Sequence, residues 1–95
     1  MTQQRFDSVW DAIEDTPEQA QSMRLRSTLM IALSDHIDRA GLTQTEAAAL
    51  FGVTQPRVSD LIRGKIGLFS LDTLVNMASA AGLQVALQVG ESAAA

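Results

Sequence analysis

The apolar residues recur at helical spacing along most of the chain and alternate strictly near its end. Over residues 17–40, Leu25, Leu29, Leu33 and Ile37 follow one another every four residues, which predicts one face of a long helix. The residues that frame this helix are Thr16 as N-cap, Pro17 as the first helical residue, Gln19 as the capping-box partner and Gly41 as the stop. The residues expected to widen its apolar face are Met30, Ala32 and Ala40, and those expected in solvent are Arg24, Arg26 and His36.

A shorter apolar cluster precedes this helix. Phe6, Val9, Trp10 and Ile13 have the spacing of one or two amphipathic helical turns. We expect the aromatic side chains to anchor this segment on the domain, whereas an exposed Trp10 would mark a partner site.

Two short helices joined by a tight turn are predicted over residues 43–64. Thr43 and Glu46 have the spacing of a capping box, and Gly52 stands where a left-handed residue ends the first helix. The second helix is marked by Thr54 as N-cap, Pro56 in its first turn, an apolar stripe of Val58, Leu61 and Ile62 expected to face inward, and Gly64 as its end. An αα-hairpin without a ligand has the same pattern.

The end of the chain combines a last helix with a segment of different period. Ser70 is the predicted N-cap of the last helix, its inner face is Leu71, Leu74, Val75 and Ala78, and Gly82 stops it. Over residues 83–89 the period becomes two, and the residues of one face are Leu83, Val85, Leu87 and Val89. A lone strand leaves backbone groups unpaired. We therefore expect it to pair with its counterpart in a homodimer or with a sheet edge of another protein; an extended tail is the alternative.

The predicted fold class is all-α, a compact helical bundle with a short C-terminal β-strand used in dimerisation. The chain has 95 residues, 46% of them hydrophobic, which suits one small domain over residues 1–95 with little room for a catalytic cleft. Residues 1–7 and 90–95 are expected to be disordered.

Composition excludes several classes of function. The chain has no cysteine, one histidine and no glycine-rich phosphate loop, so we predict no enzyme, no metal site and no cofactor. No signal peptide and no membrane-spanning segment are expected, which makes the cytoplasm the expected location.

The charge distribution bears on nucleic-acid binding. The net charge is −4, but residues 21–67 carry six basic and four acidic residues and are the net-positive block. This excess of +2 is small for a DNA-binding domain. We therefore expect modest affinity per subunit and a need for dimerisation.

The predicted DNA-binding residues lie around the second short helix. They are Gln44, Thr54, Gln55, Pro56, Arg57, Ser59, Asp60, Arg63 and Lys65. Gln55 can pair with both N6 and N7 of adenine, and Arg57 can fork to guanine O6 and N7 or bind a phosphate. Gln44, at the start of the preceding helix, can reach a phosphate.

The charged residues of this set have alternative roles. Asp60 can accept from cytosine N4, or pair with Arg57 or Arg63 at helical spacing. Arg63 and Lys65 suit phosphate contacts. For Asp60 and Lys65, solvated surface is an equal alternative.

The run from Gln44 to Gly64 resembles the helix-turn-helix of Xre-type repressors, the lambda-repressor and Cro class. Counted from Gln44, alanine stands at position five, glycine at nine, a β-branched residue at fifteen and apolar residues at eighteen and nineteen. The resemblance implies a compact lambda-repressor-like bundle that binds a palindromic double-stranded DNA operator as a homodimer. In that class the glutamines that begin both helices contact DNA, and Gln44 and Gln55 match them. Pro56 and Arg57 depart from the small residues common there, so the base preference is not transferable.

Residues 9–89 also resemble the HigA-like antitoxins of toxin–antitoxin modules. The resemblance rests on the runs Arg57–Lys65 and Leu68–Leu74 and on the closing strand. It implies a dimer that represses its own operon and neutralises a toxin protein, a RelE/HigB-like messenger-RNA-cleaving ribonuclease. The acidic residues 7–18 suit a basic partner, although such a run is also typical of a solvated face. A stand-alone Xre-type repressor, and an interaction module that has lost DNA binding, are the alternatives.

Overall fold

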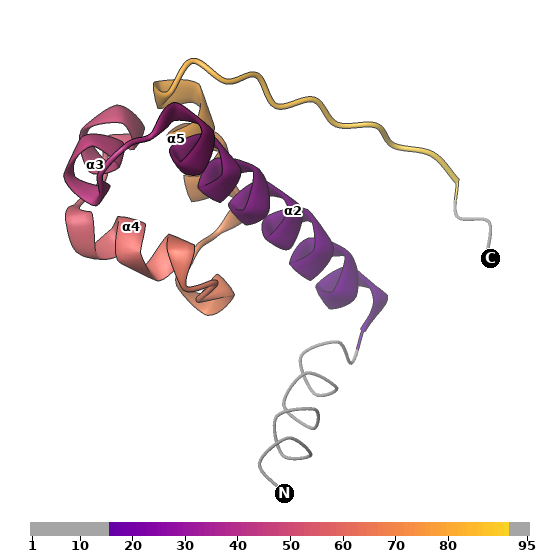
Figure 1. Ribbon diagram of the computed structural model, residues 1–95. Coiled ribbons are helices and arrows are strands. Elements are labelled where there is room, and N and C mark those ends of the chain that lie inside the picture. The colour runs from indigo at the N-terminus through magenta and orange to yellow at the C-terminus, as the bar shows by residue number, and fades with distance from the viewer. Residues whose placement is uncertain (1–15, 92–95) are drawn as a thin grey trace, which may run out of the picture.

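The computed structural model describes residues 16–91 (Figure 1). The predicted helical turns around Trp10, the fraying of residues 1–7 and most of the predicted disordered C-terminal end lie outside this range. Within it the elements are α2 (Pro17–Ala40), α3 (Gln44–Phe51), α4 (Gln55–Ile62), the 3-10 turn η1 (Ile66–Leu68) and α5 (Leu71–Ala80).

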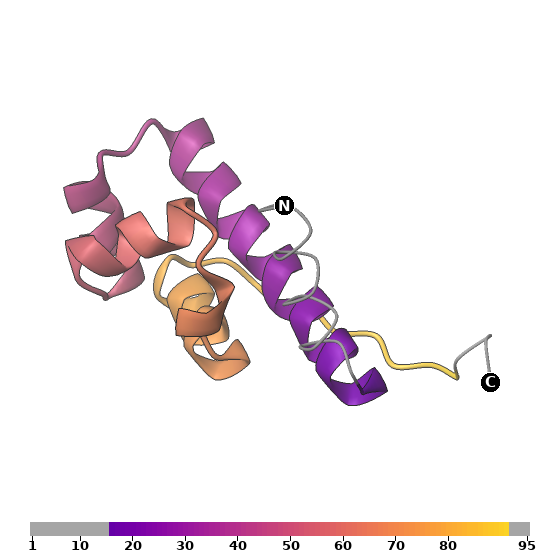
Figure 2. The same cartoon turned by 90° about the horizontal axis from the view of Figure 1, so that it is seen from below.

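The long helix α2 is the element on which the others assemble. Helices α4 and α5 and the turn η1 all contact α2, while α3 packs on α4 and α5 (Figures 1 and 2). Helices α3 and α4 therefore lie together near one end of α2, far from its first residues.

Each helix begins as the sequence predicts, at a hydroxyl side chain that accepts from the backbone amide three residues on. These caps are Thr16, Thr43, Thr54 and Ser70. At Thr43 the capping box is complete, because Glu46 Oε1 also accepts from the Thr43 amide at 2.9 Å. Gly41 and Gly52 end α2 and α3 with φ of 65° and 71°, the left-handed conformation that glycine adopts without steric cost.

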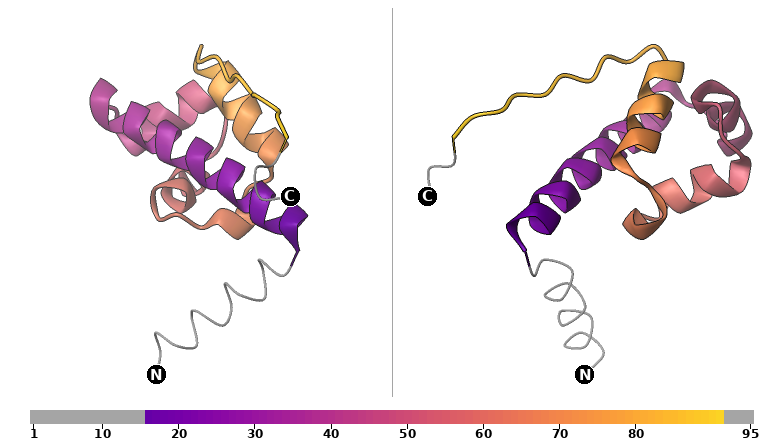
Figure 3. Two further views of the ribbon diagram at one scale, coloured as in Figure 1. Left: turned by 90° about the vertical axis from the view of Figure 1, so that its right-hand side faces the viewer. Right: turned by 180° about the vertical axis from the view of Figure 1, so that it is seen from behind.

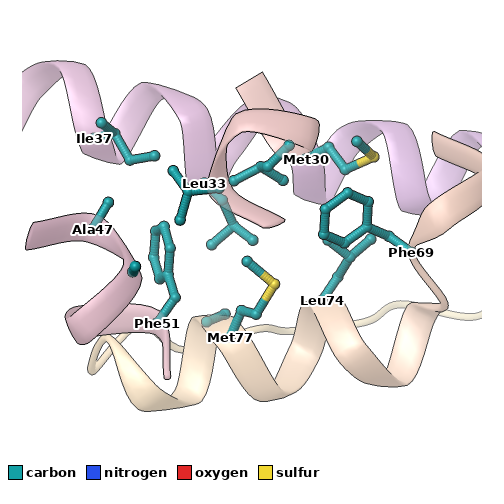
Figure 4. Close-up of a cluster of buried hydrophobic side chains, with 12 residues drawn as sticks. Met30, Leu33, Ile37, Ala47, Phe51, Phe69, Leu74 and Met77 are labelled. Carbon is teal, nitrogen blue, oxygen red and sulfur yellow. The ribbon is translucent and has the colours of Figure 1, made fainter. Parts of the chain in front are cut away.

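A single hydrophobic core lies between the four helices and the turn η1 (Figure 4). Its buried members are Met30, Leu33, Ile37, Ala47, Ala48, Phe51, Val58, Leu61, Phe69, Leu74, Met77 and Ala78. Phe69 folds back from the segment after α4 and is 1% exposed.

The core-facing stripe of α2 differs from the predicted one. Met23, Met30, Leu33 and Ile37 are buried, whereas Leu25 and Leu29 are half-buried, and Ala32 and Ala40 are exposed. An α-helix has about 3.6 residues per turn, so a strict four-residue repeat drifts by about 40° at each step. Over the three steps from Ile37 back to Leu25, that drift carries the repeat off the core face.

The prediction that Arg26 is solvated is wrong. Its side chain is half-buried, and its Nη1 donates to the carbonyl oxygens of Ile66 and Phe69, both at 3.4 Å. Its Nε donates to the Ser22 carbonyl at 3.4 Å. Arg26 thus fastens the turn that follows α4 to the long helix, by donating to two turn carbonyls, of which that of Ile66 also accepts from the Phe69 amide at 3.2 Å.

The predicted strand Leu83–Val89 is not formed in the single chain. The segment leaves α5 as extended chain without ladder hydrogen bonds (Figures 1 and 3). A strand requires a second strand to accept and donate its backbone bonds, and residues 16–91 provide none. Leu83 is instead half-buried against the core of its own chain, and its amide donates to the Ala78 carbonyl at 2.9 Å.

The Arg26 contacts make a testable contribution to stability. We expect Arg26→Ala to lower the free energy of unfolding by about 1–2 kcal/mol, because two turn carbonyls lose a charged donor in a half-buried site. Arg24→Ala is the control, since Arg24 is exposed on the same helix, and should change stability by less than about 0.5 kcal/mol. Urea denaturation followed by circular dichroism measures both, and equal unfolding midpoints would contradict this role.

Candidate nucleic-acid interface

Helices α3 and α4 form a helix-turn-helix whose turn is fixed by backbone and cap hydrogen bonds. Gly52 reverses the chain after Phe51, and the Val53 amide donates to the Ala48 carbonyl at 3.0 Å. The Thr54 hydroxyl then accepts from the Arg57 amide at 3.4 Å and starts α4. Ala48 is small and buried, which lets the two helices approach closely.

Only one narrow face of α4 is buried. Val58 and Leu61 are 0% and 1% exposed. Ile62 was expected beside them, but this expectation is wrong, because Ile62 is 47% exposed. It follows Leu61 by about 100° of helical rotation at the last position of α4, which takes it past the edge of the contact with the core.

The other predicted DNA-binding residues around α4 differ in exposure. Those that are exposed are Gln44, Thr54, Gln55, Pro56, Arg63 and Lys65; those that are half-buried are Arg57, Ser59 and Asp60. Gln44 is the first residue of α3, where backbone amides lack helical partners and the helix dipole favours an anion. The arrangement presents a polar, partly cationic helix edge backed by an apolar face.

Arg57 makes contacts within its own chain that the sequence did not reveal. Its Nη1 donates to the Leu68 carbonyl at 3.4 Å, and its Cζ lies 5.6 Å from the centre of the Phe69 ring. A guanidinium at this distance over the ring makes a cation–π contact. No local pattern marks these contacts, because Leu68 and Phe69 reach Arg57 only after the chain has turned back through η1.

Asp60 pairs with two cations. Its Oδ2 lies 3.7 Å from Arg57 Nη1, which is one of the two helical pairings that the sequence allows, and its Oδ1 lies 4.0 Å from Lys65 Nζ. The pairing with Lys65 was not predicted. It follows from Gly64, whose φ of 74° folds the chain back so that the Lys65 amide donates to the Asp60 carbonyl at 3.0 Å.

A shallow apolar groove of about 370 Å³ runs beside the end of α4. Its apolar lining is Met30, Ile31, Leu61, Ile62 and Ile66. Within residues 16–91, no three His, Cys, Asp or Glu side chains are grouped to hold a metal ion. No helix in the same range is long and apolar enough to span a membrane.

Comparisons with known proteins agree with this geometry. The model of a family described as "Helix-turn-helix domain" matches residues 12–90. A solved structure named "Putative XRE Family Transcriptional Regulator" is similar, with a TM-score of 0.70 and 34% sequence identity over 78% of this chain and 83% of that chain. A search of curated proteins found no match.

The family match covers more than half of the chain, and the solved relative shares both the fold and a third of the aligned residues. The expectation that the chain is not an enzyme is confirmed by this membership. The chain belongs to the helix-turn-helix domain family and, within it, to the Xre type.

Proposed function

We propose that this protein is a sequence-specific DNA-binding transcription regulator that inserts α4 into the major groove. The observation that carries this proposal is the division of α4 into a buried face, Val58 and Leu61, and an exposed polar edge that begins at Gln55. In helix-turn-helix proteins the second helix contacts base edges through its N-terminal residues.

Each exposed residue then has a role set by its position. Gln55, the first residue of α4, reaches the base edges and pairs with adenine. Thr54, Pro56 and Ser59 line the same edge. Gln44 at the N-terminus of α3 binds a phosphate, as do Arg63 and Lys65, and Arg57 reaches either guanine or a phosphate.

Dimerisation through residues 83–89 completes the proposal. Exposure along the alternating face rises from 39% at Val85 to 68% at Leu87 and 86% at Val89, so these apolar side chains and the extended backbone lie open to a partner. A second copy supplies a matching strand and satisfies both chains at once. It also doubles the number of phosphate contacts, which the small positive excess of residues 21–67 makes necessary.

The finer proposal is that the protein is an antitoxin that represses its own operon and binds a RelE/HigB-like ribonuclease toxin. Its support is the resemblance of residues 9–89 to HigA-like antitoxins. A stand-alone repressor is the alternative, and the adjacent gene distinguishes the two: a small basic ribonuclease-like product that co-purifies with this chain supports the antitoxin. The cytoplasmic location stays a prediction.

The experiment that tests the proposed function is selection of bound fragments from genomic DNA. The expected result is a palindrome whose half-site centres lie about 34 Å apart, or a multiple of that distance. Binding that weakens steeply with salt supports phosphate contact. Failure to retain any fragment at low salt would favour the interaction module without DNA binding.

Gln55→Ala should selectively weaken the operator complex. We expect a loss of about 1–3 kcal/mol on the selected operator and little change on random duplex, because an adenine contact is removed. Gln44→Ala is the matched control, an exposed glutamine that is expected to bind phosphate and should weaken binding to both duplexes equally. Fluorescence anisotropy measures all four affinities, and equal losses for Gln55→Ala on both duplexes would make it a phosphate contact.

Leu87→Asp should dissociate the dimer. Burial of an unpaired carboxylate at the strand interface should raise the dimer Kd by at least about tenfold. Gln88→Asp adds the same charge at the neighbouring exposed position, on the opposite face, and should have a smaller effect. Sedimentation equilibrium measures both, and an unchanged dimer for Leu87→Asp would exclude this interface.

A further inference from the structure

Asp60 occupies an unusual place for an acidic residue on a helix that must approach DNA. It lies on α4, and each of its two carboxylate oxygens faces a different cation, Arg57 at 3.7 Å and Lys65 at 4.0 Å. All three side chains remain partly exposed. The carboxylate is therefore the internal counter-ion of two of the cations that a phosphate would bind.

The other contacts of Arg57 leave it available to DNA. The Leu68 carbonyl engages Nη1, and the Cζ lies over the Phe69 ring. A guanidinium has five N–H donors, so donors remain after the Leu68 contact is made. The contact with Asp60 is the one that a phosphate competes with directly, because both ligands are anions.

The charge of the helix edge depends strongly on this one carboxylate. Over residues 55–65 the basic side chains are Arg57, Arg63 and Lys65, and Asp60 is the acidic one. A phosphate that approaches Arg57 or Lys65 meets a like charge within about 4 Å of its ligand. Phosphate contacts supply the sequence-independent part of DNA binding. The repulsion from Asp60 therefore weakens this part more than it weakens contacts with base edges.

We propose that Asp60 is a residue that limits affinity: it pairs with Arg57 and Lys65 and so lowers affinity for DNA of any sequence, leaving base contacts a larger share of the binding free energy. This proposal rests on the proposed function and adds to it. It also departs from the expectation that Asp60 accepts from cytosine, because each of its carboxylate oxygens lies within 4.0 Å of a cation.

The test is Asp60→Asn against Glu18→Gln. Both variants remove one negative charge, but Glu18 is exposed at the start of α2, far from α3 and α4 (Figure 1). Affinities for the selected operator and for a random duplex of equal length are measured across a salt series. Circular dichroism checks the fold, and Asp60→Ser is the second variant if the asparagine variant does not fold.

The expected result is tighter binding of Asp60→Asn to the random duplex. Each additional phosphate that the variant neutralises steepens the slope of log K against log salt by about 0.9, which is about 8-fold in affinity between ~1 M and ~0.1 M salt. Affinity for the operator should rise by a similar factor, because phosphate contacts form on DNA of any sequence, and Glu18→Gln should behave as the unaltered protein.

Two results would overturn the proposal. One is that Asp60→Asn and Glu18→Gln have equal effects, which would assign the change to net charge alone. The other is that Asp60→Asn loses affinity only for operators with cytosine at one position, which would make Asp60 a base-contacting residue.

A second measurement separates this inference from the proposed function. If the unaltered protein binds neither duplex, the proposed function fails, and elution from heparin–agarose then decides the role of Asp60. If Asp60→Asn elutes later than Glu18→Gln, the proposed role of Asp60 as a counter-ion is supported. If the two variants elute identically, that role is overturned.

Discussion

The structure depends on the burial of two side chains of α4. A helix of eight residues is too short to be stable alone in water, so α4 is helical because Val58 and Leu61 are buried in the core. The same burial fixes the rotation of α4 about its own axis. With one face buried in the core, the polar residues from Gln55 to Arg63 are left exposed or half-buried on the other side of α4, and that is the property on which DNA binding would depend.

Two arginines stabilise the segment that follows α4, and neither role is visible in the sequence. Arg26 on α2 donates to the carbonyls of Ile66 and Phe69, and Arg57 on α4 donates to the carbonyl of Leu68. The backbone of η1 thus receives side-chain donors from two helices, while the Phe69 ring fills the core beneath them. The position of α4 and the conformation of this turn are therefore coupled, because Arg57 belongs to one and contacts the other.

The molecule carries little positive charge, so the position of each basic residue matters for its contacts with phosphates. The chain is acidic as a whole, with a net charge of −4, and one of its few cationic regions has its own counter-ion in Asp60. A single subunit arranged in this way would derive little affinity from phosphates. That physical condition favours a protein that binds as a pair and discriminates by base contacts, and it connects the proposed dimer to the proposed role of Asp60.

The sequence by itself determined the helices and their ends. Hydroxyl caps, a capping box and left-handed glycines act within four residues, so the boundaries of α2, α3, α4 and α5 follow from local hydrogen bonding. The burial of Val58 and Leu61 also follows from helical spacing.

The tertiary structure alone decided which of the apolar residues on α2 enter the core, that Ile62 is exposed, and that Arg26 and Arg57 bind distant carbonyls. Those outcomes depend on where other helices end and on hydrogen-bond partners that are 11 to 43 residues away in the sequence. Local periodicity does not predict contacts at such separations. The alternation of residues 83–89 predicted the extended backbone but could not supply a strand, because a strand's hydrogen bonds belong to its partner as much as to itself.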